Sequence, residues 1–189
     1  MRGADQPAGE HGQRVAELAR AIAVELGWPR DRADALHAAA LVHDSGLSEE
    51  IWAKPWPLTT AEWELVHQHP DRGAAMAEVS LGAEEALWVR HHHERVDGRG
   101  YPSGLSGEEI PEGSRIIALA EAYDAMIARL GSGPDGLLEV LAECRACAGT
   151  QFWAPAVEAL ERLVGPPAEA GHLAEPEPGE AWSPPAGAF

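Results

Sequence analysis

Residues 90–105 are the most informative stretch of this sequence. They read Arg90-His91-His92-His93-Glu94-Arg95-Val96-Asp97-Gly98-Arg99-Gly100-Tyr101-Pro102-Ser103-Gly104-Leu105. Neutral imidazoles bind divalent transition metals, and a carboxylate can complete or bridge such a site. The glycines that follow let the backbone come close to a ligand, where a Cβ atom would clash. The stretch therefore predicts a metal site beside a glycine-rich loop.

Apolar residues recur at helical spacing through most of the chain, and Gly or Pro ends most of these runs. The pattern predicts helices over residues 11–26, 31–44, 60–68, 70–80, 83–92, 113–130, 135–147 and 155–164. Residues 47–58 are expected to form a loop. We expect a break before Pro70, because proline disfavours helical geometry in the residue that precedes it. Strand alternation is absent from the sequence, so the predicted fold class is all-α.

The length of 189 residues suits one well-cored domain. We expect this domain to cover residues 10–165, between a flexible N-terminus of residues 1–9 and a disordered tail of residues 166–189. The tail is rich in Pro, Ala and Glu, a composition that cannot bury enough apolar surface to order itself. Cys144 and Cys147 lie in one helical run and are interpreted as small, half-buried helix residues.

The net charge of −17 argues against binding of DNA or RNA, because contacts to a phosphate backbone need basic patches. A small anionic nucleotide held by metal ions stays compatible with this charge. The sequence shows no signal peptide and no apolar run near ~18 residues. A cytoplasmic protein without a membrane anchor is therefore expected.

Further potential metal ligands come from four other segments, mostly at the ends of predicted helices. With the two histidines of the central stretch, the candidates are His11, His43, Asp44, His69, His92, His93, Glu121 and Asp124. Imidazoles with a carboxylate able to bridge are the composition expected for a two-metal site. Two cations about 3.5–4 Å apart can clamp a phosphate and lower the pKa of a shared water, so that hydroxide attacks phosphorus. Asp124 is as suited to orienting a ligand as to binding metal, and the non-ligand histidines are taken to be His37, His67, His91 and His172.

The motifs, taken in order, resemble the HD-GYP family, the phosphodiesterase branch of the HD metal hydrolases. The resemblance covers about residues 11–164 and rests on residues 41–46, 54–59, 62–64, 69–73, 92–105, 110–111, 115–117, 123–126 and 149–152. It implies an HD-type helical bundle that hydrolyses cyclic di-GMP with iron or manganese ions. A third ion is not expected, because Pro7 stands where three-metal members carry a Glu.

The resemblance also assigns residues to roles. The implied metal ligands are His11, His43, Asp44, His69, His92, His93 and Glu121, with Asp44 bridging and Glu121 in place of the family's Asp. His43 and Asp44 are the implied catalytic pair. The implied substrate-binding residues are Arg95, Asp97, Gly98, Gly100, Tyr101, Pro102 and Arg115. The resemblance further allows a protein partner at the Gly100-Tyr101-Pro102 loop, and a homodimer.

Two departures from the family pattern concern substrate handling. Leu47 stands where the family usually has a Lys close to the substrate phosphate, and Leu can supply neither a cation nor a proton. Residues 131–134 replace a basic segment that can contact substrate in the family. The leading hypothesis is a two-metal phosphodiesterase for cyclic di-GMP or a related phosphate ester. The alternative is a catalytically degenerate domain that works as a metal- or nucleotide-binding signalling or interaction module.

Overall fold

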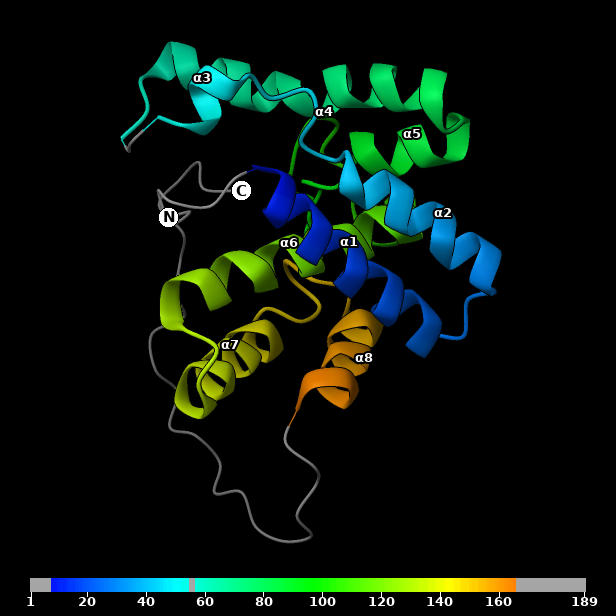
Figure 1. The fold of residues 1–189 in the computed structure, drawn as a ribbon, viewed down its shortest axis with the longest axis vertical. Coiled ribbons are helices and arrows are strands. Elements are labelled where there is room, and N and C mark those ends of the chain that lie inside the picture. The colour runs from blue at the N-terminus through cyan, green and yellow to red at the C-terminus, as the bar shows by residue number, and fades with distance from the viewer. Residues whose placement is uncertain (1–7, 55–56, 166–189) are drawn as a thin grey trace, which may run out of the picture.

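Eight α-helices run through the part of the chain that the structure describes, residues 8–54 and 57–165 of a computed structural model (Figure 1). They are α1 (Ala8–Glu25), α2 (Arg30–Leu41), α3 (Glu49–Trp52), α4 (Thr60–Ser80), α5 (Ala83–Arg90), α6 (Glu112–Leu130), α7 (Pro134–Ala146) and α8 (Ala154–Val164), with a 3-10 turn, η1, at Gly107–Glu109. These ranges contain no strand, which confirms the all-α prediction. Pro7, His172 and the predicted tail lie outside the described residues.

Helices α1 and α6 form the centre of the bundle. Helix α1 packs against α2, α6 and α8, and α6 also contacts α5 and α7. Their buried faces carry the apolar residues whose spacing predicted them, among them Ile22 on α1 and Ile116 and Leu119 on α6. The many alanines of the core allow close approach, and a Cβ on Gly12 would already lie 3.0 Å from the carbonyl oxygen of Leu41.

Helix α4 is continuous from Thr60 to Ser80, so the predicted break before Pro70 is wrong. The start was predicted well: the Thr59 side chain accepts from the backbone N–H of Glu62, and Glu62 accepts from the backbone N–H of Thr59. Proline in a helix interior removes one backbone hydrogen bond. Here Pro70 and Gly73 are buried, and a Cβ on Gly73 would lie 3.2 Å from Val89 of α5. The carbonyl of Val66, which Pro70 leaves without a helical donor, lies 2.6 Å from Nδ1 of His69.

Three smaller differences concern the bounds of elements. Helix α1 begins at Ala8 rather than at residue 11, within the stretch of residues 1–9 that was expected to be flexible. The expected loop of residues 47–58 contains the short helix α3, which Ser48 caps at its N-terminus. Helix α5 ends at Arg90 rather than at residue 92, so the histidine run lies in the turn that follows it. Both cysteines are free; Cys144 is buried and Cys147 is half-buried. No described helix combines the length and apolarity needed to cross a bilayer.

Candidate metal centre

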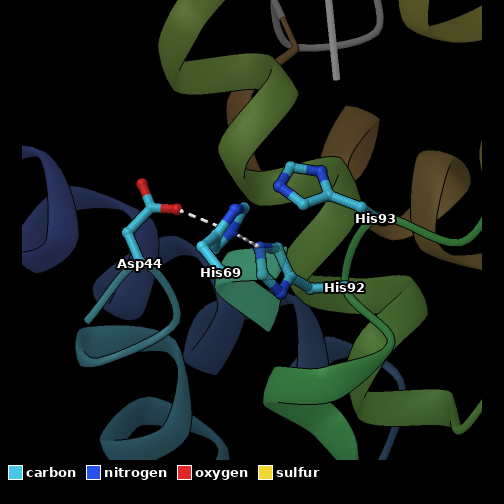
Figure 2. A group of neighbouring side chains, drawn as sticks. All are labelled: Asp44, His69, His92 and His93. Atoms are coloured by element: carbon cyan, nitrogen blue, oxygen red, sulfur yellow. Dashed lines mark hydrogen bonds and ion pairs between the residues drawn. The ribbon is translucent and has the colours of Figure 1, made fainter. Parts of the chain in front are cut away.

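Two overlapping groups of side chains bring potential metal-binding atoms together. One group holds Asp44, His69, His92 and His93, and Figure 2 shows their side chains converging. The other group holds His11, His43, Asp44 and Glu121. Within each group the potential ligand atoms all lie within 4.8 Å of one another. The seven residues are those that the sequence proposed as ligands, and Asp44 belongs to both groups.

These ligands come from five separate segments. His11 lies on α1, His43 and Asp44 in the turn after α2, His69 in α4, His92 and His93 in the turn after α5, and Glu121 on α6. Gly46 allows the turn after α2 to lie directly on α4, because a Cβ there would be 2.1 Å from the carbonyl oxygen of His69. This close approach places one Asp44 oxygen 3.2 Å from Nε2 of His69.

Three of the histidines are oriented in the same way. Nδ1 of His43, His69 and His92 lies 2.6, 2.6 and 2.5 Å from the carbonyl oxygen three residues earlier in the chain. A carbonyl only accepts hydrogen bonds, so each Nδ1 carries the proton and the neutral ring keeps a lone pair on Nε2.

The carbonyls that hold these rings lack the usual helical partner. Those of Ala40 and Val89 belong to the last turns of α2 and α5, where helical N–H donors run out. The carbonyl of Val66 sits four residues before Pro70, which has no N–H to offer. Helix ends and one proline therefore set the direction of three imidazoles.

The resulting arrangement suits cations. Nε2 of His69 and Nε2 of His92 face each other at 3.3 Å, and two lone pairs at that distance repel unless a positive charge lies near them. Buried Nε2 atoms of His11 and His43 make no hydrogen bond. The pKa of His92 is well below its usual value because the ring is buried, and the neighbouring His43 and His69 lower it further. A neutral imidazole is the form that binds a metal ion.

A second carboxylate, Asp124, orients His11. Its Oδ2 accepts from Nδ1 of His11 at 2.7 Å, and Arg14 donates to both of its oxygens at 2.6 and 3.0 Å. Burial would raise the pKa of Asp124, but the hydrogen bonds from His11 and Arg14 outweigh it and lower the pKa. Such a carboxylate behind a histidine fixes its tautomer and increases its basicity. The sequence left the role of Asp124 open and missed Arg14, although both His11 and Arg14 lie on one face of α1.

The loop after the histidines is held by Glu94, the carboxylate that directly follows them and to which the sequence assigned no role of its own. This carboxylate accepts hydrogen bonds from the backbone N–H groups of Ser103 and Leu105 instead. Tyr101, one of the predicted substrate-binding residues, stacks on His93 with ring centroids 4.7 Å apart and an angle of 21°. The Tyr101–Pro102 peptide bond is cis.

The other predicted substrate-binding residues have partners within the protein. Arg95 donates two hydrogen bonds to Asp97 and one to Gln151, and its hydrogen bonds lower the pKa of Asp97. Gly98 has a φ of +76°, which favours glycine. The guanidinium of Arg115 lies 4.3 Å from the ring centroid of Trp153, and its buried Nε has no hydrogen-bond partner. The substrate-binding roles of these residues stay predictions.

Comparisons with known proteins give matches over most of the chain. The sequence profile described as HD domain matches residues 4–154. The 3'3'-cGAMP-specific phosphodiesterase 1 of Vibrio cholerae is 39% identical over 137 residues, which are 70% of this chain and 32% of that protein. A cyclic di-GMP phosphodiesterase of Thermotoga maritima is 36% identical over 169 residues, 84% of this chain and 45% of that protein.

Solved structures share the fold. A cyclic GMP-AMP specific phosphodiesterase of V. cholerae gives a TM-score of 0.68 at 23% identity, over 84% of this chain and 44% of that one. An HDG"Y"P protein of Bdellovibrio bacteriovorus gives 0.68 at 20% identity, over 86% of this chain and 54% of that one. The chain therefore belongs to the HD domain family. Its relatives place it in the HD-GYP branch. It spans less than half the length of the two curated relatives named above.

Proposed function

We propose that this chain is a metal-dependent phosphodiesterase that hydrolyses a cyclic dinucleotide. The observation that carries the proposal is the position of Asp44, whose carboxylate belongs to both groups of potential ligands. A carboxylate shared in this way suits a pair of divalent ions that act together on one phosphate. The names of the relatives, cyclic di-GMP and 3'3'-cGAMP phosphodiesterases, support a cyclic dinucleotide as substrate.

The proposed ligands are His11, His43, Asp44, His69, His92, His93 and Glu121. Imidazole nitrogens with two carboxylates suit iron or manganese, which are the ions we propose. When bound, two such ions supply an activated water and positive charge for the phosphate. The protein's own part is to fix the tautomer and direction of the imidazoles, through the carbonyls at the Nδ1 atoms of His43, His69 and His92 and through Asp124 at Nδ1 of His11.

Burial contributes to the same end. His43 is 1% exposed and Glu121 is 2% exposed, so water has little access to compete for these ligands. Excluding water strengthens every electrostatic interaction in a site. We assign the substrate side of the centre to the predicted loop residues Gly98, Gly100, Tyr101 and Pro102, together with Arg95, Asp97 and Arg115.

Leu47 supports a second candidate function, a degenerate HD-GYP domain that binds metal or nucleotide without turnover. Its backbone N–H donates to the carbonyl of Asp44 at 2.9 Å, so it lies in the turn that carries the shared carboxylate. Its aliphatic side chain offers no charge or proton to a phosphate.

Metal analysis followed by turnover on the same sample tests both functions. Protein prepared with iron or manganese should contain about two ions per chain, and it should convert cyclic di-GMP or 3'3'-cGAMP to a linear product. Asp44→Asn should lose both metal and turnover, whereas Glu109→Gln, in an exposed capping box, should lose neither. A protein that binds two ions but shows no turnover, and that gains turnover on Leu47→Lys, would favour the degenerate domain. Protein that binds no metal would refute the centre itself.

A further inference from the structure

The loop after the histidines folds back onto the backbone that carries them. A Cβ on Gly100 would lie 2.5 Å from backbone atoms of His93, Glu94 and Arg95, so only glycine allows this contact. The backbone N–H of Tyr101 then donates to the carbonyl oxygen of His93 at 3.2 Å. The loop and one proposed metal ligand are therefore in direct contact.

A buried carboxylate holds the far end of the loop. Glu94 is 3% exposed, and its two oxygens accept separately from the backbone N–H groups of Ser103, at 2.6 Å, and of Leu105, at 3.1 Å. Hydrogen bonds to an ionised acceptor are roughly twice as strong as neutral ones. His91 also lies near this carboxylate, with its Nδ1 3.7 Å from Oε1 of Glu94. Glu94 thus connects the turn that carries the histidines, before Tyr101, to residues 103–105, after Tyr101.

The ring of His93 contacts side chains from α6 and from the loop. Its Nδ1 lies 4.0 Å from Oε2 of Glu121 on α6. The ring of His93 packs flat against Tyr101. Tyr101 is itself backed on its other side by His67, at a centroid distance of 4.4 Å.

We propose that Glu94 is a positioning residue of the metal centre: it anchors the loop so that Tyr101 stacks on His93 and fixes the direction of that imidazole. The proposal rests on the proposed function for its effect on turnover, but not for its effect on metal binding. Residues that contact the ligands but not the metal typically weaken metal affinity by about 10–100-fold when they are removed.

The test compares the metal affinity of the wild type with those of Glu94→Gln, Tyr101→Ala and the double variant, by calorimetric titration with manganese in the absence of substrate. Glutamine has the shape of Glu94 but can no longer accept with both oxygens, so affinity should fall about tenfold or more. Tyr101→Ala should cause a similar loss. Since Glu94 acts through Tyr101, the double variant should bind no worse than the weaker single variant.

Glu109→Gln is the matched control. Glu109 also accepts two hydrogen bonds in this segment, from the backbone N–H and the hydroxyl of Ser106, but it is exposed and caps η1. Its loss should leave manganese affinity unchanged. In the metal-free protein, amide exchange at Ser103 and Leu105 should be faster in the variants that carry Glu94→Gln and unchanged in Tyr101→Ala and Glu109→Gln.

Several outcomes would overturn the proposal. These are wild-type affinity in Glu94→Gln, wild-type affinity in Tyr101→Ala, or losses that add in the double variant. If Glu94→Gln does not fold, the Tyr101→Ala result decides. Manganese affinities that follow the prediction in a protein without turnover would refute the proposed function and leave the role of Glu94 standing.

Discussion

Replacing Gly46 by alanine should damage the metal centre although every proposed ligand is kept. The added Cβ would lie 2.1 Å from the carbonyl oxygen of His69 and 2.6 Å from the backbone nitrogen of Gly73, both in α4. Ordinary contacts begin near 3.4 Å, so the turn must move away from α4 by about 1.3 Å. Asp44 lies two residues earlier in the same turn and moves with it.

The size of the effect follows from that displacement. Asp44 lies 3.2 Å from His69 and 3.4 Å from His43, and a shift of this size removes it from at least one of them. A misplacement of about 1 Å at a reacting centre can cost on the order of 100-fold in rate. Overpacking of this kind also destabilises by about 1–3 kcal/mol. We therefore expect Gly46→Ala to lose most metal and about 100-fold in turnover.

A graded series of glycines supplies the controls. On Gly73 the nearest atoms to an added Cβ are 3.2–3.4 Å away, so Gly73→Ala should have an intermediate effect. On Gly9, in α1, an added Cβ meets nothing within 4 Å, and Gly9→Ala should keep full activity and gain up to about 1 kcal/mol in stability. Metal content, turnover and thermal unfolding of the three variants check the order. Full metal and turnover in Gly46→Ala would refute the reasoning.

Two further predictions concern Asp124 and the cysteines. Asp124→Asn should weaken metal binding by about 10–100-fold, since one uncharged amide oxygen is left to accept from both His11 and Arg14; a calorimetric titration with unchanged affinity would contradict this. Burial raises the pKa of Cys144 to about 12 and that of Cys147 to about 11, so both thiols should stay protonated at pH 8. A disulfide reagent should therefore modify the native thiols on the order of 100-fold more slowly than those of the unfolded chain, and equal rates would show that they are accessible.

Local sequence signals predicted the elements that local interactions decide. The start of α4 follows from Thr59 and Glu62, three residues apart, and the apolar spacing of α6 predicted its buried face. The path of α4 through Pro70 could not be predicted in this way. A rule about the residue before proline is local, whereas α4 packs along α5, which comes later in the chain, and tertiary packing of this kind routinely overrides local propensity.

In the candidate site, too, some roles could be predicted from the sequence and others depend on the fold. The ligand set followed from motifs that resemble a known family, and the structure brings all seven side chains together. The roles of Glu94 and Arg14 did not follow, because their partners are chosen by the fold: Leu105 lies across a returning loop, and Asp124 lies on another helix. Residue type alone marks a carboxylate as a possible ligand, and only its neighbours show which task it has.

The spread of the ligands along the chain has a consequence for folding. They run from His11 on α1 to Glu121 on α6, with His69 on α4 and with His92 and His93 in the turn after α5. Figure 1 shows α4 and α5 as a hairpin at one end of the bundle. Ions bound by the proposed ligands would act as a cross-link over a long stretch of chain, much as a disulfide does. The unfolded chain has no such site, so the free energy of metal binding becomes free energy of folding. If the proposed centre binds metal, the supply of metal adds to the direct packing of α5 on α2 and α6 in joining the α4–α5 hairpin to the rest of the bundle.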